Sequence, residues 1–362
     1  MPTENTKILE SENKSMLRIG IIGLGNISQK HINEILKSDK AKISAICDID
    51  KAKLSSVGDK LGIDENCRFE NYIDLIKCDK VDAVEICTPN HLHIPMAMEA
   101  AKANKPVEVE KPLSIDYAGV DRLVEEINSK NIPNMMCFSY RFMPAVRYAK
   151  DILSKGKIGK IINVNVEYLK DSAFFNGRRL EWRFVKKYAG SGVLGDLGVH
   201  LIDMTRFLVG DFENVYAMKN IVVDKRKKLD SEEIADVETD DIISFIAKLG
   251  GSVIANFMVT RCAIGNKNTI KYEIYGTDGV IVFNLNNPQE ITLCFATDRE
   301  NATLETLAVP KEYFVGQEET FIETALGNVQ ENLPDINEGA ACQRIVDALL
   351  KSSETGIPVK IK

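Results

Sequence analysis

The sequence predicts an α/β protein in which a doubly wound parallel sheet is followed by an α+β domain with a large, mostly antiparallel open sheet. From residue 16 to residue 139, short apolar segments alternate with amphipathic helical segments, the pattern of a parallel sheet covered on both faces. From residue 140 onward, most segments have the alternating or β-branched character of strands, and few helices separate them. A length of 362 residues also favours two domains over a single core.

The first domain, residues 16–139, is expected to alternate strands with helices. Its short apolar segments predict strands at 17–23, 41–48, 81–88, 105–110 and 133–140. The segments between them carry apolar residues on one face and predict helices at 26–38, 50–62, 91–104 and 116–131.

The second domain, residues 140–362, is expected to begin with a helix at 144–159. Strands are expected at 160–169, 215–224, 241–249, 251–261, 269–277, 279–285 and 290–296. Glycine-containing turns at 249–252 and 276–279 predict antiparallel hairpins, because glycine supplies the backbone angles that tight hairpin turns require. Helical patterns return at 317–328 and 337–356.

The composition is typical of a soluble enzyme or binding protein, with 44% hydrophobic and 27% charged residues. A net charge of -7 argues against nucleic acid or an anionic membrane as the main partner. No apolar run approaches the ~20 residues of a membrane helix. The eight cysteines include no CxxC pair, which indicates free thiols and a cytoplasmic location. Residues 1–15 are polar and are expected to form a flexible tail.

A glycine turn between the first strand and its helix indicates a dinucleotide site of the Rossmann type. Gly23 allows a tight turn, and Gly25 lets the backbone of the loop, which includes Asn26 and Ile27, approach a pyrophosphate at the helix N-terminus. The third position of the fingerprint is Ser28, which is small enough for the helix to pack on the strand.

Asp48 follows the second expected strand, where a carboxylate can accept hydrogen bonds from the hydroxyls of the adenosine ribose. A carboxylate there repels a 2′-phosphate, and no arginine follows in 47–53, so NAD is favoured over NADP. The alternative is that Asp48 caps the helix expected at 51–61.

Two more loops follow strands and are expected to border the ligand crevice of an open α/β sheet. Asn90, after the strand at 81–88, either contacts a ligand or caps the next helix. The spacing of His91 and His93 does not suit a zinc pair, and capping or contact with a cofactor is favoured for His93. Lys111 lies at the carboxyl end of the buried strand 105–110, before Pro112. Most lysines are solvated surface residues, but this position favours a functional role for Lys111.

The segment GVLGDLGVHLID, residues 192–203, spaces Asp196, His200 and Asp203 by four and three residues, which places them on one face of a helix. Either this polar face is exposed to water, with an acid near a helix N-terminus, or it borders a cleft in which proton transfer occurs. The presence of Lys111 and the dinucleotide fingerprint favours the cleft, because titratable groups gather at active sites.

These motifs, in this order, resemble the Gfo/Idh/MocA oxidoreductases, which include glucose–fructose oxidoreductase and inositol dehydrogenases. The resemblance begins near residue 16 and rests on GIIGLGNISQKHI, CDID, TPNHLH, EKPLS, WR at 182–183 and GSGVLGDLGVHLID. The EKP and DxxxHxxD motifs are specific in combination. Two departures, Ser28 and the AGSG before the predicted catalytic helix, remove no charged group.

The resemblance implies roles for individual residues and an oligomer, a homodimer or homotetramer, formed through the C-terminal sheet. Lys111, Asp196 and His200 match the catalytic residues of the family, and Asp203 matches an acid that holds a substrate hydroxyl. Contact with substrate is implied for Arg141, Trp182 and Arg183, and a position at the nicotinamide-ribose end for Thr88, Pro89, Asn90, His93 and Glu110. For Arg141 and Arg183 the alternative is an interdomain ion pair, and for Trp182 it is packing at a domain junction.

We therefore expect an NAD-dependent dehydrogenase that acts on a ring hydroxyl of a cyclic polyol, sugar or sugar derivative, with no metal. His200 is assigned as the base in oxidation and Lys111 as the group that stabilises the alkoxide, although either could accept the proton. Asp196 either orients the imidazole or binds a neighbouring hydroxyl. The alternatives are a dinucleotide-binding sensor without turnover and an NADP-dependent sugar reductase.

Overall fold

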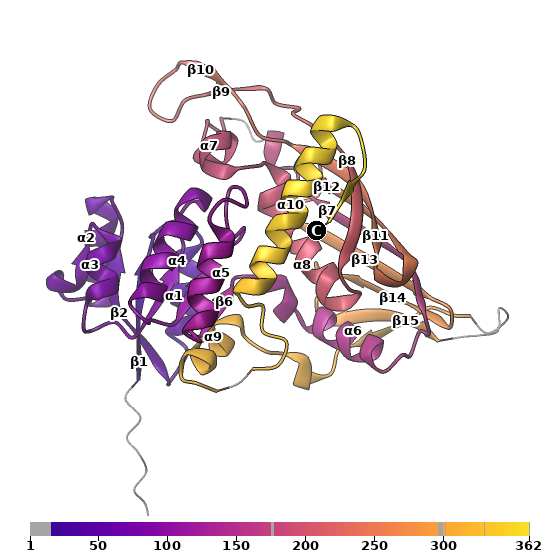
Figure 1. The fold of residues 1–362 in the computed structure, drawn as a ribbon, viewed down its shortest axis with the longest axis horizontal. Coiled ribbons are helices and arrows are strands. Elements are labelled where there is room, and N and C mark those ends of the chain that lie inside the picture. Colours follow the sequence, from indigo (N-terminus) through magenta and orange to yellow (C-terminus); the bar gives the residue numbers. More distant parts are fainter. Residues whose placement is uncertain (1–15, 175–176, 296–299, 301, 329, 362) are drawn as a thin grey trace, which may run out of the picture.

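The computed structural model consists of two sheets with their helices, joined side by side (Figure 1). It describes residues 16–361 apart from 175–176, 296–299, 301 and 329, so the tail predicted at 1–15 lies outside the described residues. Among the described helices, none is both long and apolar enough to cross a membrane.

The first sheet is parallel and six-stranded, in the order β3-β2-β1-β4-β5-β6. Its strands are β1 (Leu17–Ile22), β2 (Ala41–Cys47), β3 (Arg68–Phe69), β4 (Ala83–Ile86), β5 (Val107–Val109) and β6 (Asn134–Met136). Its helices are α1 (Ser28–Ile35), α2 (Lys51–Leu61), α3 (Tyr72–Lys77), α4 (His93–Lys102) and α5 (Val120–Ser129). The strand order reverses between β1 and β4, which is where ligands bind in open α/β sheets. The predicted doubly wound domain is confirmed, and only the short β3 and α3 were not expected.

The second sheet has nine strands, in the order β16-β15-β14-β13-β7-β12-β11-β8-β17. They are β7 (Ile161–Leu169), β8 (Phe212–Asn220), β11 (Ile242–Leu249), β12 (Val253–Thr260), β13 (Thr269–Gly276), β14 (Gly279–Asn284), β15 (Glu290–Phe295), β16 (Glu305–Ala308) and β17 (Val359–Lys360). Both predicted hairpins are present, and only the β7–β12 pair is parallel among the described strand pairs of this sheet. The prediction of a mostly antiparallel sheet is therefore confirmed.

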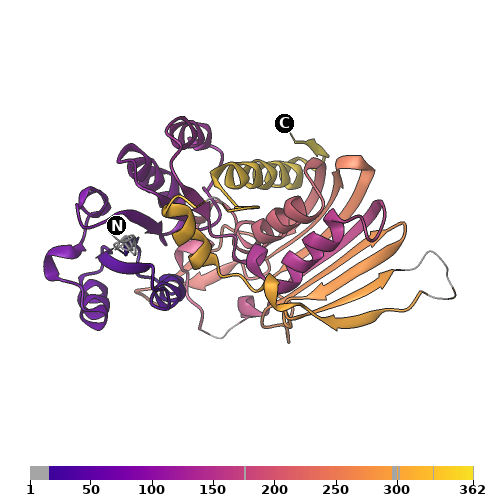
Figure 2. The same ribbon diagram turned by 90° about the horizontal axis from the view of Figure 1, so that it is seen from below.

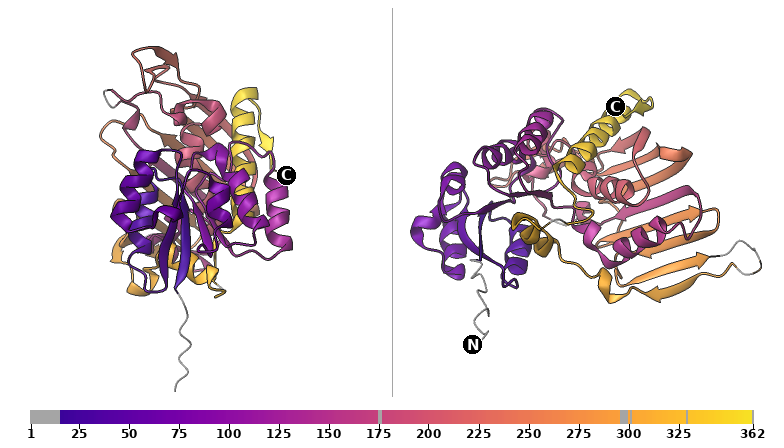
Figure 3. Two further views of the ribbon diagram at one scale, coloured as in Figure 1. Left: turned by 90° about the vertical axis from the view of Figure 1, so that its left-hand side faces the viewer. Right: turned by 60° about the horizontal axis from the view of Figure 1, so that its bottom comes forward.

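Helices cover one face of this second sheet (Figures 2 and 3). They are α6 (Pro144–Ser154), α8 (Val199–Leu208) and α10 (Ile336–Thr355), and α7 (Lys186–Ala189) precedes α8 in the chain. A separate hairpin of β9 (Lys225–Lys227) and β10 (Ile234–Asp236) projects beyond the sheet (Figure 1). Burial alternates along β11 and β12 of the nine-stranded sheet, because every second side chain of these strands faces the helices and packs against them.

The C-terminal part of the chain returns to the first domain. Helix α9 (Gln317–Ala325) packs against α1, and α10 packs against α5 and β6. The backbone N–H of Met136 donates to Pro334 O at 2.7 Å, and that of Ile336 donates to Asn134 Oδ1 at 2.7 Å. The predicted boundary near residue 139 lies between β6 and α6, but the last helices contact both domains.

Candidate active site

The glycine turn adopts the conformation that its sequence predicts. Gly23 has a φ of 93°, and a β-carbon there would lie 2.7 Å from the carbonyl oxygen of Cys87, so only glycine fits. Gly25 faces open space, with no atom within 4 Å of where a β-carbon would be. Ser28 is buried, and its hydroxyl donates to Gly25 O at 2.7 Å. The loop is therefore closed by the serine and leaves room for a ligand against its backbone.

Asp48 lies directly after β2 and supports this turn. Its Oδ2 accepts the N–H of Leu24 at 2.7 Å, and its Oδ1 accepts the N–H of Asp50 at 2.9 Å. The alternative interpretation of Asp48 as a helix cap is wrong, because the side chain of Asp50 caps α2. An ionised carboxylate has about four acceptor sites, so Asp48 retains capacity for ribose hydroxyls.

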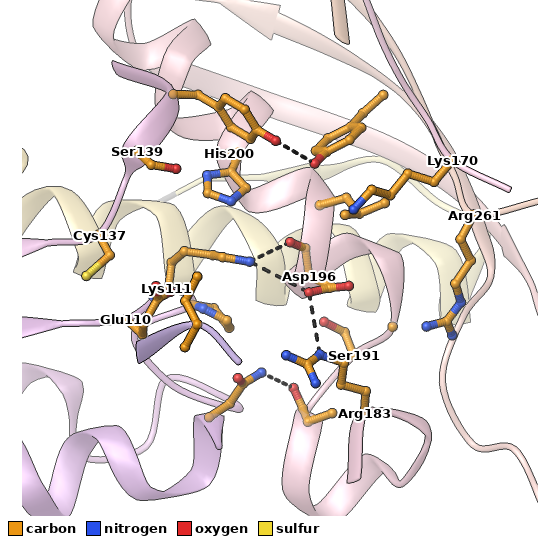
Figure 4. Close-up of a pocket in the computed structure, with 18 of the residues that line it drawn as sticks. Glu110, Lys111, Cys137, Ser139, Lys170, Arg183, Ser191, Asp196, His200 and Arg261 are labelled. Carbon is orange, nitrogen blue, oxygen red and sulfur yellow. Dashed lines mark hydrogen bonds and ion pairs between the residues drawn. The ribbon is translucent and has the colours of Figure 1, made fainter. Parts of the chain in front are cut away.

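The loops that follow β4 and β5 meet the second domain at a cavity of about 230 Å³ (Figure 4). The predicted site residues that line it are Ile27, Thr88, Asn90, Glu110, Lys111, Trp182, Arg183, Asp196 and His200. Gly23, Gly25, Asn26, Asp48 and Pro89 are not part of its lining. The cavity is thus built from both domains, as a site between a cofactor and a substrate requires.

Lys111 extends from the end of β5 across to the second domain. Its Nζ donates to the carbonyl oxygen of Asp196 at 2.7 Å and lies 3.7 Å from Asp196 Oδ1 (Figure 4). The side chain is only 15% exposed. The ammonium group is therefore held at a fixed position on the cavity wall rather than extended into solvent.

The segment before α8 differs from the regular helix expected from its sequence. Leu194–Gly198 forms a π-helical turn, and α8 begins only at Val199. In a π-helix the hydrogen bond spans five residues, so the simple rule for spacings of four does not apply across it. Asp196 and His200 both line the cavity, whereas Asp203 does not. The prediction that all three share one cleft-facing side is wrong for Asp203.

Asp240 holds this turn in place. Its buried carboxylate accepts the N–H groups of Gly192 at 2.7 Å and Leu194 at 3.0 Å. A β-carbon on Gly192 would lie 1.9 Å from the carbonyl oxygen of Asp240, so the close approach requires glycine. The AGSG segment retains this glycine, although it departs from the usual glycine-rich pattern.

Asp196 is flanked by two cations. Arg183 Nε lies 3.8 Å from Asp196 Oδ1, on the other side from Lys111 (Figure 4). Burial would raise the pKa of Asp196, but Lys111 and Arg183 lower it to about 2. The carboxylate is therefore ionised at any physiological pH and can only accept hydrogen bonds.

The imidazole of His200 is buried at the cavity wall and packs edge-on against Tyr140, with ring centroids 4.6 Å apart. Its Nδ1 has no hydrogen-bond partner among the described residues. Asp196 makes no hydrogen bond with this ring, so the idea that Asp196 orients it is not supported, and Tyr140 does so by packing. Burial, helped by the charge of Lys111, lowers the pKa of His200 well below 6.5. The ring is neutral at pH 7 and free to accept a proton.

Trp182 and Arg183 form one wall of the cavity. The guanidinium carbon of Arg183 lies 4.4 Å from the centroid of the Trp182 ring, a cation–π arrangement. Arg183 forms ion pairs with Asp196 and Glu181, which both lie in the second domain. The interdomain ion pair considered as an alternative for Arg183 is therefore not present.

Several lining residues were not identified from the sequence. The hydroxyl oxygens of Tyr140 and Tyr168 are 2.8 Å apart and hydrogen-bonded, and the Tyr168 hydroxyl donates to Asn268 Oδ1 at 2.9 Å. Lys170 lies near this network, with its Nζ 5.8 Å from the centroid of the Tyr168 ring. Tyr168 lies near the end of β7 and Lys170 directly follows it, and the sequence signal was their place at the end of an expected strand. Nothing in an antiparallel pattern indicated which end of that strand faces the first domain.

Arg141 and Asp203 require a correction, because they do not line the cavity. Arg141 Nε lies 3.0 Å from both carboxylate oxygens of Asp203, and its Nη2 lies 2.6 Å from Oδ1. Arg141 also binds Glu338 of α10. The two side chains are 4% and 1% exposed. They form a buried ion pair within the second domain, so the pair is not the interdomain one that the sequence left open for Arg141.

His93 is also placed differently from the expectation of a cofactor contact. It is fully buried, with Nδ1 2.7 Å from the carbonyl oxygen of Pro112 and Nε2 2.9 Å from that of Thr88. The ring therefore ties the β4 loop to the β5 loop. It positions Thr88 and Lys111 without facing the cavity.

These features fit a dinucleotide. The open space beside Gly25 admits a pyrophosphate, Asp48 can accept ribose hydroxyls, and the cavity bordered by Thr88, Glu110 and Lys111 lies at the topological switch point. The fold and the site together define an oxidoreductase with a nucleotide-binding domain.

The comparisons with known proteins give the family. Residues 17–137 match the oxidoreductase family with an NAD-binding Rossmann fold, and residues 146–282 match the GFO/IDH/MocA C-terminal domain. The chain belongs to the Gfo/Idh/MocA oxidoreductase family. The expected resemblance, the NAD-binding domain and an oxidoreductase acting on CH–OH groups are confirmed at this level.

Several of the relatives are named as sugar or polyol dehydrogenases. Levoglucosan dehydrogenase of Pseudarthrobacter phenanthrenivorans is 35% identical over 247 residues, which span 64% of this chain and 63% of that protein. Glucose-6-phosphate 3-dehydrogenase of Bacillus subtilis is 23% identical over 96% of this chain and 99% of that protein. A structure of levoglucosan dehydrogenase in complex with NADH matches 96% of this chain and 100% of that chain, with 28% identity and a TM-score of 0.87.

Proposed function

We propose that this chain is an NAD-dependent dehydrogenase that transfers a hydride between nicotinamide and a secondary hydroxyl or ketone of a cyclic polyol, sugar or sugar derivative. The observation that carries the proposal is the meeting of Lys111, Asp196 and His200 at one cavity between the two domains. The names of relatives such as levoglucosan dehydrogenase and myo-inositol 2-dehydrogenase support a cyclic substrate.

His200 is proposed as the base that takes the hydroxyl proton during oxidation. Its low pKa keeps the ring neutral, so that it can accept a proton. Nδ1 is buried, which leaves Nε2 as the nitrogen proposed to face the substrate. A bound nicotinamide would supply the hydride acceptor. In the direction of reduction the same nitrogen returns the proton.

Lys111 is proposed to stabilise the alkoxide that develops as the proton leaves. Among the described residues its Nζ donates one hydrogen bond, to Asp196 O, and an ammonium group has three donors, so capacity remains for a substrate oxygen. Asp196, held ionised between Lys111 and Arg183, is proposed to accept a hydrogen bond from the neighbouring hydroxyl. Arg183 and Trp182 would then form the wall against which a sugar ring lies.

The preference for NAD over NADP is proposed from Asp48. Its carboxylate is held at the glycine turn by two backbone N–H groups and would repel a 2′-phosphate. No arginine follows Asp48 in residues 49–53 that could bind such a phosphate. An intact Lys111, Asp196 and His200 set favours turnover over a sensor that only binds the dinucleotide.

The test is a panel of cyclic polyols, aldoses and anhydrosugars assayed with NAD⁺ at the absorbance band of NADH, with His200→Ala as the variant. We expect at least one panel member to be oxidised, and the variant to lose about 10²–10⁴-fold in kcat, the range for removal of a general base. NADH affinity, measured by fluorescence titration, should not change. Turnover in the variant equal to that of the wild type would refute the assignment of the base.

We also propose a homo-oligomer formed through the outer face of the nine-stranded sheet, opposite the helices. Exposed apolar side chains collect there: Met218, Ile246, Ile254 and Met258 on β8, β11 and β12. Apolar patches on an otherwise polar surface mark sites of association. Light scattering of the purified chain tests this, since a monomer would contradict it.

A further inference from the structure

A second group of titratable side chains lies inside the Rossmann domain, apart from the cavity described above. Glu85 of β4 and Glu108 of β5 are register partners in adjacent parallel strands, so their side chains leave the sheet on the same face. His31 of α1 and Glu318 of α9 face them from the covering helices. All four residues are buried, and the two strand glutamates are completely so.

The polar atoms of these four side chains converge on one point. His31 Nδ1 lies 3.0 Å from Glu318 Oε1, 3.2 Å from Glu85 Oε2 and 3.9 Å from Glu108 Oε2. The four groups offer ligand atoms that all lie within 4.8 Å of one another. These contacts lack hydrogen-bond geometry: His31 Nδ1, both oxygens of Glu85 and Glu108 Oε2 have no hydrogen-bond partner among the described residues.

The cluster has three carboxyl groups and, among the described residues, a single basic side chain, that of His31. Burial opposes the charged imidazole, but neighbours that include Glu318 raise the pKa of His31 well above its ordinary value. Within the part of the chain that the structure describes, the only ion-pair partner of Glu85, Glu108 and Glu318 is His31. Burial and the adjacent Glu318 raise the pKa of Glu85 to about 7. Several buried carboxylates at such distances are strongly unfavourable unless a positive charge lies between them.

The other nitrogen of His31 explains why Nδ1 faces the carboxylates. Nε2 lies 3.2 Å from Glu110 Oε1, and the two are hydrogen-bonded. When Nε2 carries the proton, Nδ1 presents a lone pair to the cluster. A carboxylate that receives the N–H of a histidine whose second nitrogen binds a metal is the usual arrangement around metal-binding histidines.

We propose that His31, Glu85, Glu108 and Glu318 bind one divalent cation, through His31 Nδ1 and one oxygen of each glutamate. Ligand distances of about 2.0–2.2 Å in a tetrahedral site place neighbouring ligand atoms ~3.4 Å apart, close to the 3.0, 3.2 and 3.9 Å separations from Nδ1. One imidazole with three carboxylates suits Mn²⁺, Fe²⁺ or Zn²⁺ better than Ca²⁺, which takes only oxygen ligands.

The site has an access route and a connection to the active site. His31, Glu110 and Glu318 line a second cavity, of about 620 Å³, through which an ion can reach the cluster. Glu110 Oε2 accepts the backbone N–H of Lys111 at 3.0 Å. The cation therefore acts as a structural ion that orders His31 and Glu110, and through them the backbone that carries Lys111. It does not touch the substrate.

The test uses the full-length protein, treated with EDTA and then titrated with MnCl₂ in the absence of substrate. Free Mn²⁺ is followed by its electron paramagnetic resonance signal, and thermal unfolding is measured in parallel. The variant is Glu318→Gln, and the matched control is Glu319→Gln. The two glutamates are neighbours on α9, but Glu319 is half exposed and pairs with Lys40.

We expect one Mn²⁺ per chain and a rise in the unfolding temperature of about 5 °C at 100-fold excess over Kd. Glu318→Gln should weaken binding at least tenfold, whereas Glu319→Gln should bind as the wild type does. Electron spin-echo measurements on the wild type should show coupling to one histidine nitrogen, a signal that does not depend on whether the variant folds.

Absence of stoichiometric Mn²⁺ binding would overturn the proposal and leave a cluster neutralised by protons alone. Binding without histidine coupling, or binding that Glu319→Gln weakens as much as Glu318→Gln does, would overturn it as well. None of these measurements involves hydride transfer, so the result stands apart from that of the dehydrogenase assay.

Discussion

Replacement of Lys111 by methionine removes a charge from the cavity at little cost to the fold. Methionine has a similar length, and the side chain is only 15% exposed, so packing is largely retained. The variant loses one hydrogen bond, to Asp196 O, a loss of about 1 kcal/mol in stability. If the ammonium group stabilises the developing alkoxide, kcat should fall about 10²–10³-fold, the effect of removing one donor from an oxyanion site.

The same substitution makes a prediction about pH dependence. The charge of Lys111 adds to burial in lowering the pKa of His200, so its removal should raise that pKa. A general base must be neutral to act, and the acid limb of the profile of kcat/KM follows its pKa. In the wild type this limb should therefore lie well below pH 6.5, and in Lys111→Met it should move to higher pH.

Lys170→Met is the matched comparison, because Lys170 lines the same cavity but forms no ion pair with a carboxylate among the described residues. We expect it to raise KM more than it lowers kcat, with a smaller displacement of the acid limb. Initial rates from pH 5 to pH 9, with NADH affinity as a control, provide the measurement. A fall in kcat of less than tenfold in Lys111→Met, or an acid limb that stays in place, would refute the reasoning.

Two further predictions concern the cofactor and the fold. Asp48→Ala should reduce the preference for NAD⁺ over NADP⁺ by about tenfold or more, because the repulsion of a 2′-phosphate is lost; unchanged kcat/KM ratios for the two cofactors would contradict this. Arg141→Met should lower the free energy of unfolding by about 3 kcal/mol, because Asp203 is left buried without its main partner. Urea unfolding measures the difference, and a change below 0.5 kcal/mol, the usual size of a surface substitution, would show that the ion pair is not important for stability.

The order of strands and helices was predictable because local patterns determine it. Buried parallel strands are short and apolar, so segments such as 17–23 and 81–88 were recognised, and their carboxyl ends gave the positions of Gly25, Asn90 and Lys111. β3 and α3 were not recognised, because a strand of two residues and a helix of six contain too little periodicity.

The side chains around Asp196 were predicted less well, because their directions depend on the backbone. Asp196, in the π-helical turn, still shares the cavity with His200, whereas Asp203, three residues after His200 in the regular helix α8, faces Arg141 in the interior. Residues three apart on a helix differ by about 60° around its axis, and spacing alone carries no information about which of them borders a cavity. Arg141 could not be distinguished from a substrate contact, since an arginine near an acid serves either purpose.

The buried glutamates of the proposed cation site had a signal in the sequence that was not used. Glu85 and Glu108 interrupt two apolar strands, AVEIC and VEVE, at positions where strands buried on both faces carry apolar residues. Their alignment with each other requires the register of β4 and β5, and the contribution of Glu318 requires the return of α9, which lies more than 200 residues later. Only the structure supplies these two facts.

The return of the C-terminal helices has a consequence for synthesis of the chain on the ribosome. The nucleotide-binding domain is encoded by the first part of the sequence, yet α1, α5 and β6 lack their covering helices until α9 and α10 emerge. About 180 residues separate β6 from α9, so at ~5–20 residues per second this domain waits roughly ten seconds or more with apolar surface uncovered. Nascent chains stalled before residue 317 should therefore bind chaperones more strongly than the completed protein does.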